Sequence, residues 1–272
     1  MVIHRYFNIL LYITFKFIMK LKLHSNKIVP IILAAGRGSR MKRLTKNKPK
    51  SFVKIDKSKR LIDKVIENFV SLGFKKITLI TGYKSSQFNE FKKINKIKNR
   101  KWKTTNIFGS LICADRILSK YQCIISYADI CYDKEAIEIL KKSKNKKGIV
   151  ILSFKFWKKY WQERFKNPLK DLETFKVNNK NQLLEIGDRT DSYRNIQGQY
   201  MGVFKIDPNT WDKIKQQLFK ENKNLNKIDI TALFQLILKK KICNIYVKNY
   251  KKKWFEIDNI NDYNLLKKSN KI

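Results

Sequence analysis

The chain has 272 residues, of which 43% are hydrophobic and 12% aromatic, so a wholly disordered protein is excluded. It carries 61 Lys and Arg against 22 Asp and Glu, a formal net charge of +39. This charge invites a nucleic-acid interpretation, but the lysines are spread from Lys16 to Lys271 and form no single arm or stripe. A broad compositional bias therefore explains the charge better than a specific polyanion site, and no specific nucleic acid is expected as a partner.

The cysteines and histidines narrow the possible chemistry. The four cysteines are Cys113, Cys123, Cys131 and Cys243. They form no C-x-x-C pair, so free thiols in a reducing cytoplasm are expected and a zinc site is not. The only histidines, His4 and His24, precede the first motif, which excludes a Ser-His-Asp triad from the body of the protein.

Residues 1–26 are predicted to be an N-terminal extension ahead of a single domain over 27–272. The apolar run Tyr6–Met19 is shorter than the roughly 20 residues that a membrane span requires, and no small-residue cleavage site follows it. Residues 1–18 fit an upstream extension or a mis-set start. A peripheral membrane anchor and a docked helix or strand are the other interpretations.

Apolar runs alternate with segments of helical spacing along most of the chain. Strands are predicted at 27–34, 76–81, 122–126, 148–154 and 242–247, and helices at 61–72, 108–118, 134–142, from Pro208 and from Asp229. Pro30 weakens the first strand, because proline donates no hydrogen bond to a sheet. The alternation predicts an α/β fold with a Rossmann-like, mostly parallel sheet flanked by helices.

Residues of about 155–205 break this alternation. Aromatic and charged residues mix there, and turn signals occur at 167–168 and 178–179. We expect a small antiparallel, lid-like insertion beside the main sheet that forms the acceptor side of the site.

The most informative motif directly follows the first predicted strand, where residues 33–51 read LAAGRGSRMKRLTKNKPKS. Gly36 and Gly38 permit a tight turn whose backbone N–H groups point at an anion, and Arg40 and Lys50 are within reach of the same anion. A G-x-G turn alone is weak evidence, because it lacks the third glycine of a dinucleotide site and the G-K-[ST] of a P-loop. The whole string is much more specific than its parts.

This string resembles the signature of the nucleotidyltransferases that activate phosphorylated small molecules, L-A-A-G-x-G-x-R followed by a P-K pair. The resemblance extends from about Ile31 to Tyr263 and implies catalytic roles for Arg40 and Lys50. It implies that Asp129 and Asp258 bind Mg²⁺. The residues implied to bind the nucleotide are Leu33, Ala34, Ala35, Gly36, Gly38, Gly82, Tyr83, Asn106 and Ser110.

Segments further along are similar to the cytidylyltransferase branch, among them Glu185–Gly187 and Gly198–Gly202. That branch joins CTP to phosphocholine, 2-aminoethylphosphonate and related compounds, with release of pyrophosphate, to decorate a surface polysaccharide or lipid. The implied partners are CTP, or another NTP, and a small phosphorylated acceptor. One departure is Lys155, because relatives often carry an aspartate shortly before the tryptophan equated with Trp157; this places the acceptor in doubt, but not the reaction.

The residue chemistry supports this interpretation independently. Asp129 and Asp258 each follow an apolar run, CIISYA and WFEI, so both are predicted at strand ends. Magnesium prefers one or two carboxylates together with phosphate oxygens. The attacking phosphate or phosphonate oxygen is already ionised at neutral pH, so the missing histidines are no obstacle.

The acceptor side combines carboxylates with aromatic residues. The candidates are Asp171, Glu173, Trp157, Tyr200 and Glu256. Such a set suits an organic cation, by charge pairing and by cation–π contact. The alternative is that Trp157 and Trp161, one helical turn apart, pack a helix onto the core, and that Tyr200 belongs to the core.

Three other functions are alternatives to a cytidylyltransferase. A sugar-1-phosphate nucleotidyltransferase shares the loop signature, although Gly198–Gly202 argues against it. A basic nucleic-acid-binding protein would explain the charge but has no recognisable binding motif in this sequence. A catalytically weak relative with a scaffold role is disfavoured by the presence of Lys50 and both aspartates.

Overall fold

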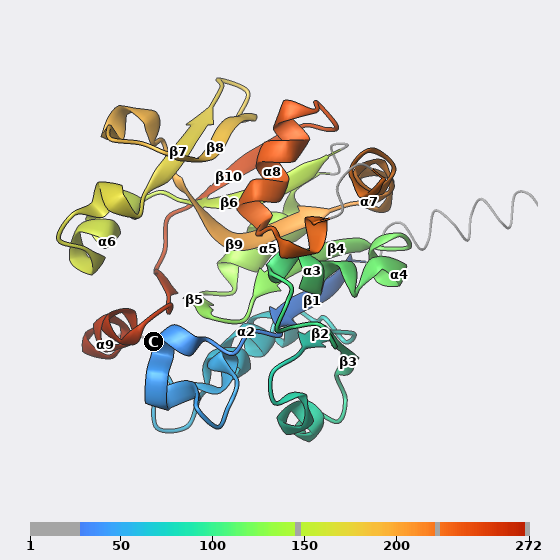
Figure 1. The fold of residues 1–272 in the computed structure, drawn as a ribbon, viewed down its shortest axis with the longest axis vertical. Coiled ribbons are helices and arrows are strands. Elements are labelled where there is room, and N and C mark those ends of the chain that lie inside the picture. The colour runs from blue at the N-terminus through green and yellow to red at the C-terminus, as the bar shows by residue number, and fades with distance from the viewer. Residues whose placement is uncertain (1–27, 145–147, 221–223, 270–272) are drawn as a thin grey trace, which may run out of the picture.

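The structure is a computed structural model that describes residues 28–144, 148–220 and 224–269. The expectations for residues 1–26 lie outside these described residues. The apolar runs form a seven-stranded sheet of order β10-β6-β9-β4-β1-β2-β3 (Figure 1). Its strands are β1 (Ile28–Ala34), β2 (Thr78–Thr81), β3 (Asn95–Lys98), β4 (Gln122–Tyr127), β6 (Ile149–Phe154), β9 (Gln199–Ile206) and β10 (Ile245–Tyr250).

The strands of this sheet are parallel except β9, which pairs antiparallel with both β4 and β6. The carboxyl ends of β1, β4, β6 and β10 therefore meet at one edge. This confirms the predicted α/β fold. It also shortens the predicted insertion: β9 lies in the main sheet, and its residues are nearly all buried because both of its faces are covered.

Pro30 is accommodated by the register of β1. Its partner is Ile124 in β4, whereas the pairing of β1 with β2 begins only at Ile31. The proline thus precedes the segment that is paired on both sides, which fits its inability to donate a hydrogen bond.

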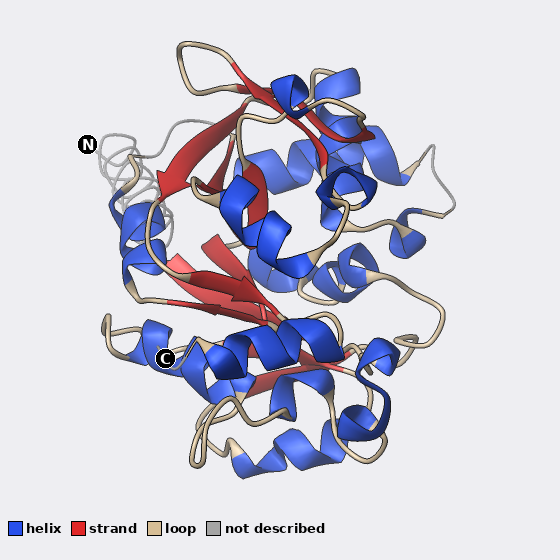
Figure 2. Ribbon diagram, turned by 90° about the vertical axis from the view of Figure 1, so that its left-hand side faces the viewer, coloured by secondary structure: helices blue, strands red, loops and turns tan. Residues whose placement is uncertain are grey.

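Helices cover the two faces of the sheet (Figure 2). One apolar cluster holds α3 (Ile107–Ile112), α4 (Asp115–Leu118), α7 (Pro208–Ile214) and α8 (Ile230–Lys239) against Ile31, Ile125 and Phe204. The other holds α2 (Leu61–Val70), α5 (Glu135–Lys142) and α6 (Trp157–Arg164) against Ile32, Ile124 and Leu152. Neighbouring strand residues thus belong to opposite faces, as the period of a strand requires. The helix predicted over 108–118 is divided into α3 and α4.

Two smaller antiparallel sheets complete the fold. β5 (Ile130–Tyr132) pairs with β11 (Trp254–Glu256), just before α9 (Ile260–Lys268), and β7 (Glu173–Val177) pairs with β8 (Leu183–Arg189). The short 3-10 helices are η1 (Ser39–Thr45), η2 (Lys50–Phe52), η3 (Ser85–Glu90), η4 (Pro168–Lys170), η5 (Tyr193–Asn195) and η7 (Leu225–Lys227), and a π-helical turn, η6 (Lys215–Phe219), extends α7. Among the described residues, no helix has the length and apolar character needed to cross a bilayer.

Candidate active site

The glycine loop after β1 is fixed by its own backbone and by Lys50. Gly38 adopts φ +69° and ψ +54°, the left-handed region that favours glycine. A Cβ atom there would lie 2.7 Å from both Cβ and Cγ of Lys50. The Gly38 carbonyl accepts hydrogen bonds from the Met41 backbone at 3.0 Å and the buried Thr45 hydroxyl at 2.7 Å. Glycine at this position therefore allows the loop and Lys50 to meet.

Lys50 lies between the two predicted metal ligands. Its Nζ atom is 2.7 Å from Asp129 Oδ2 and 2.7 Å from Asp258 Oδ1. Arg40 Nη2 is 3.3 Å from the same oxygen of Asp258. Lys50 and Asp258, which are 208 positions apart in the sequence, thus meet at the carboxyl edge of the sheet.

Pairing between short strands explains why the two aspartates converge. Asp129 lies between β4 and β5, and β11, two residues before Asp258, pairs with β5. The Ile257 backbone N–H donates to the Asp129 carbonyl at 3.0 Å. The preceding Ala128 donates to the carbonyl of Leu33 at 3.2 Å, which joins this segment to the end of β1.

The charges at this centre stabilise one another. Burial opposes the charged form of Lys50, whose side chain is 10% exposed, but the charges of Asp129 and Asp258 reverse this effect and raise its pKa. Burial would raise the pKa of Asp258, yet Lys50 first and Arg40 next hold it below its usual range. Lys50 is therefore the counter-ion of both carboxylates.

A buried ion pair fixes the segment that carries Asp258. Arg164, at the end of α6, donates to both carboxylate oxygens of Asp262 at 2.9 and 3.1 Å and to Glu256 at 3.2 Å. Asp262 in turn accepts from the Asp258 backbone at 2.9 Å and from the Asn259 backbone at 3.2 Å, which caps α9. Sequence reasoning did not assign this role to Arg164; the N-x-x-D capping pattern of Asn259 and Asp262 was the available signal.

Burial, and next the repulsion from Asp258, raises the pKa of Glu256 to about 8, although Arg164 opposes this shift. Glu256 thus lies beside Asp258, one of the two predicted metal ligands, and its carboxylate is bonded to Arg164.

The end of β2 packs directly on the glycine loop. The Tyr83 backbone donates to the Ala35 carbonyl at 3.0 Å, and a Cβ atom on Gly82 would lie 2.6 Å from that carbonyl oxygen. The Tyr83 ring lies beside Trp102, with the ring centroids 5.2 Å apart, and under the Arg37 guanidinium at 5.6 Å. This brings Gly82 and Tyr83 next to the glycine loop.

Asn106 and Ser110, the other two predicted nucleotide-binding residues, serve the local structure. The Asn106 side chain accepts a hydrogen bond from the Ile107 backbone at 2.8 Å and caps α3. Ser110 is buried, and its hydroxyl accepts a bond from the Asn99 side chain at 3.1 Å. Asn99, which the sequence did not single out, therefore organises this side of the site.

The tryptophans of α6 form part of the core. Trp161 stacks on Trp254 at 6.0 Å with an interplanar angle of 16°, and its indole N–H donates to Asp171 at 2.9 Å. Trp157 is 7% exposed and lies against Tyr193 at 6.2 Å. The packing alternative is thus correct for Trp161, and Asp171 supports that ring.

Tyr200 packs on the other face of the sheet from Trp161, whereas Glu173 lies on β7, outside that sheet. Burial, followed by the charges of Asp229, Asp171 and Asp188, raises the pKa of Glu173 to about 7. The Tyr200 ring packs edge-on against Tyr127 at 6.0 Å and against Phe234 at 5.3 Å. Its buried hydroxyl has no hydrogen-bond partner among the described residues. Of the five predicted acceptor residues, Tyr200 and Trp157 are therefore separated by the sheet.

The donor set at Lys50 fits one kind of metal site. Within the described residues, no group of three or more His, Cys, Asp or Glu side chains could hold a metal ion. The oxygens of Asp129 and Asp258 contact the same nitrogen, so they are close enough to share one cation. Two carboxylates suit Mg²⁺ that takes its other ligands from phosphate and water.

This sheet edge, with its glycine loop and its paired lysine and aspartates, defines an enzyme that acts on nucleoside phosphates. The model of the nucleotidyl transferase family matches residues 29–165. A Campylobacter jejuni protein, CTP:phosphoglutamine cytidylyltransferase, is 33% identical over 85% of this chain and 96% of its own length. The chain therefore belongs to the nucleotidyl transferase family and is an enzyme of this class.

Another curated protein and two solved structures are also similar to this chain. A 2-aminoethylphosphonate cytidylyltransferase of Lancefieldella rimae is 29% identical over 42% of this chain and 48% of its own length. The structure of CTP:phosphocholine cytidylyltransferase from Streptococcus pneumoniae covers 90% of this chain and all of its own, with a TM-score of 0.67 and 22% identity. That of the inositol-1-phosphate CTP transferase from T. maritima covers 89% and 96%, with a TM-score of 0.68 and 19% identity. The two structures establish the likeness of fold.

Proposed function

We propose that this protein is a magnesium-dependent cytidylyltransferase that joins CTP to a small phospho- or phosphono-compound. An ionised oxygen of the acceptor attacks the α-phosphorus of CTP and forms a phosphoanhydride bond. The bond from the α-phosphorus to the oxygen bridging it to the β-phosphorus breaks, and pyrophosphate leaves with the electron pair. No proton has to be removed from the attacking oxygen, so the reaction needs no histidine as a general base, and the described residues contain none.

The observation that carries this proposal is the convergence of Asp129, Asp258 and Lys50 beside the glycine loop. Transfer of a nucleotidyl group requires mainly positioning and compensation of negative charge. In the proposed reaction, Asp129 and Asp258 hold Mg²⁺, which neutralises phosphate charge. Lys50 and Arg40, freed from the aspartates, pair with phosphate oxygens.

The backbone of the loop supplies the remaining contacts. Residues 35–38 form the loop between β1 and η1 and offer successive backbone N–H groups. Glycine-rich loops of this kind bind phosphate groups in other proteins. The backbone around Gly82 and Tyr83 lies beside this loop and is proposed to face the base. The preference for CTP is supported by the names of the relatives, and the acceptor class by phosphoglutamine, aminoethylphosphonate and phosphocholine in those names.

The four cysteines are free, which suits a reducing cytoplasm as the place of reaction. The product would be a CDP- or CMP-linked head group for a surface polysaccharide or lipid.

The direct test is pyrophosphate release with Mg²⁺, each of the four NTPs, and a panel of phosphocholine, 2-aminoethylphosphonate, phosphoglutamine and sugar 1-phosphates. We expect turnover with CTP and a non-sugar acceptor. Asp129→Asn should lower kcat/KM at least about a hundredfold, because compensation of phosphate charge is worth several kcal/mol.

Asp133→Asn is the matched control, since its carboxylate is exposed and lies 3.8 Å from Lys64, outside the Lys50 centre. It should retain wild-type turnover. Turnover with another NTP and a sugar 1-phosphate would assign the enzyme to the sugar branch instead. Wild-type activity in Asp129→Asn would contradict the proposed metal site.

A further inference from the structure

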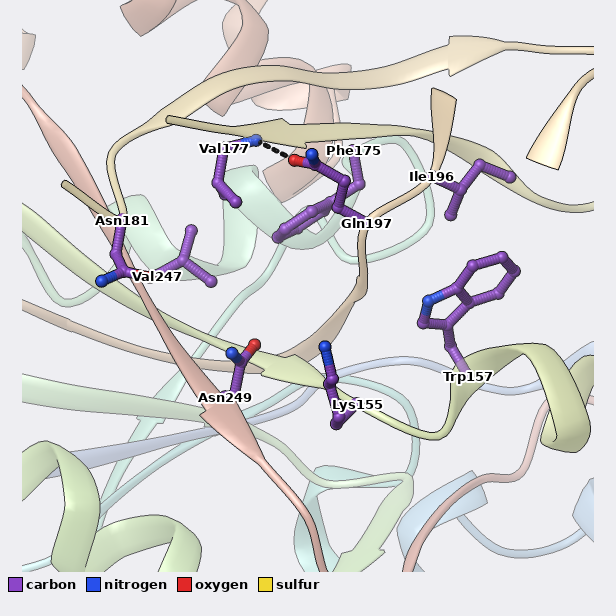
Figure 3. A pocket seen from close by; sticks show the side chains of 9 residues that line it. All are labelled: Lys155, Trp157, Phe175, Val177, Asn181, Ile196, Gln197, Val247 and Asn249. Carbon is purple, nitrogen blue, oxygen red and sulfur yellow. Dashed lines mark hydrogen bonds between the residues drawn. The ribbon is translucent and has the colours of Figure 1, made fainter. Parts of the chain in front are cut away.

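A cavity of about 450 Å³ lies where the β7–β8 hairpin covers the carboxyl ends of β6 and β10 (Figure 3). Trp157 lines one side, and Phe175 and Val177 of β7 line another. Because β6 and β4 are separated only by β9, the end of β6 lies two strand spacings, roughly 10 Å, from the segment that leads to Asp129, and the end of β10 lies one spacing further. A small acceptor whose phosphate lies near Asp129 can therefore reach this cavity with its other end.

Lys155 gives the cavity its charge. Of the described residues that line it, Lys155 alone is charged, and within the described part of the chain its ammonium forms no ion pair. The Lys155 backbone is held by its bond to the Tyr250 carbonyl at 2.9 Å. Figure 3 shows the Lys155 side chain rising from the end of β6 into the space beneath the hairpin, beside Asn249 of β10.

Two amide side chains add donors. The Gln197 carbonyl oxygen accepts from the Val177 backbone at 2.6 Å, which turns its N–H₂ group to other partners. Asn249 is exposed and offers an N–H₂ group beside Lys155. An ammonium with nearby amide donors suits a carboxylate, whereas a trimethylammonium group in the same cavity would be repelled by Lys155.

The walls suit the remainder of an amino acid. Phe175 and Val177 offer apolar surface for a short aliphatic chain.

We infer that the acceptor is a phosphorylated amino acid whose carboxylate binds Lys155, and that Lys155 determines this specificity. The inference rests on the proposed function and narrows its acceptor class.

The test compares kcat/KM, with CTP and Mg²⁺, for acceptors that differ only in one carboxylate. O-phosphoserine is paired with phosphoethanolamine, and 2-amino-3-phosphonopropionate with 2-aminoethylphosphonate; phosphoglutamine is measured alongside. The wild type should prefer the carboxylate-bearing member by about tenfold or more, the usual value of a hydrogen bond between charged groups. Lys155→Met should abolish the preference, Lys155→Glu should reverse it, and both should leave the KM for CTP unchanged.

Lys248→Met is the control, since Lys248 is exposed on β10 between two lining residues and does not line the cavity. It should keep the wild-type preference. Turnover without preference, or a preference unchanged in Lys155→Met, would overturn this inference and leave the proposed function standing. Absence of turnover with every acceptor and NTP of both panels would overturn the two together.

Discussion

Arg164 and Asp262 form a bidentate ion pair in which their side chains are only 2% and 1% exposed. The same carboxylate accepts the Asp258 backbone N–H, so the pair joins α6 to the segment that carries a proposed metal ligand. Arg164 and Asp262 are 98 residues apart in the sequence. Their ion pair affects the site because Asp262 also holds the backbone of Asp258.

Removing Arg164 should therefore affect both stability and activity. Arg164→Met leaves the buried Asp262 and the half-buried Glu256 without their cation, and breaking a buried ion pair costs about 3–5 kcal/mol. We expect the free energy of unfolding in urea to fall by this amount. Lys159→Met, on the exposed side of the same helix, should change it by less than about 0.5 kcal/mol. Equal values for the two variants would show that the buried pair does not hold this segment.

Gly38→Ala tests the contact between the loop and Lys50. The new Cβ atom would meet the Lys50 side chain at 2.7 Å in a backbone with φ +69°, so we expect a loss of about 2–3 kcal/mol together with reduced turnover. Gly73→Ala has φ +81° and open space around its Cβ position, so it should cost only about 1 kcal/mol of backbone strain. Urea unfolding measures the loss of stability, and pyrophosphate release measures the loss of turnover. Equal losses in Gly38→Ala and Gly73→Ala would show that the contact with Lys50 adds nothing to the backbone strain.

The sequence predicted those parts of the site that depend on strand ends. Carboxyl ends of parallel strands meet at one edge, so apolar runs followed by Gly36, Gly38 and Asp129 were enough to place these residues together. Asp258 needed the resemblance as well, because its approach to Asp129 depends on pairing between two three-residue strands. Strands of three residues are too short to show the alternation of apolar and polar residues from which a strand is predicted.

The remaining features depend on contacts that local patterns do not encode. Whether residues 199–206 join the main sheet or a separate hairpin is decided by which strands they pair with, and both arrangements are antiparallel. Asp171 was predicted to bind a cation, but its bond to Trp161 arises from the packing of α6. Roles of this kind follow from tertiary contacts, and a composition of carboxylates and aromatic residues does not distinguish them.

Two variants of Asp171 separate a charge that binds the acceptor from a support for Trp161. Asp171→Asn keeps an oxygen that can accept from the indole N–H but removes the charge, so we expect an unchanged KM for the acceptor. Asp171→Leu leaves the indole N–H without its partner, which should cost about 1 kcal/mol of stability and raise that KM. Steady-state kinetics with the best acceptor of the panel distinguish the two roles of Asp171. A raised KM for the acceptor in Asp171→Asn would show that the charge of Asp171 binds the acceptor.

Glu173 should make stability depend on pH. Its pKa is raised from 4.5 to about 7 in the folded protein, by burial and then by Asp229, Asp171 and Asp188. The folded state thus retains a proton that the unfolded chain has released, so stability falls as the pH rises from about 4.5 to 7 and this loss is complete above that range. The Tm of Glu173→Gln should match the wild type near pH 4.5 and exceed it increasingly up to pH 7.

Glu185→Gln is the control for this effect, because the Glu185 carboxylate is bonded to Lys176 on the exposed surface and its pKa is lowered. It should show no gain in Tm over the same range. A pH-independent difference between Glu173→Gln and the wild type would mean that Glu173 ionises normally in the folded protein.

Lys50 should compete with magnesium when no nucleotide is present. Its Nζ atom contacts both aspartates at 2.7 Å, so a cation that bridges these carboxylates has to displace it. Lys50→Met removes the competitor and leaves Asp129 and Asp258 to repel each other, which should cost about 1–3 kcal/mol in EDTA. Addition of Mg²⁺ should then raise the Tm of Lys50→Met more than that of the wild type, because binding to the folded state alone adds stability. The double variant Lys50→Met, Asp129→Asn should lose this extra response; an equal Mg²⁺ response in the wild type, the single variant and the double variant would place the metal elsewhere.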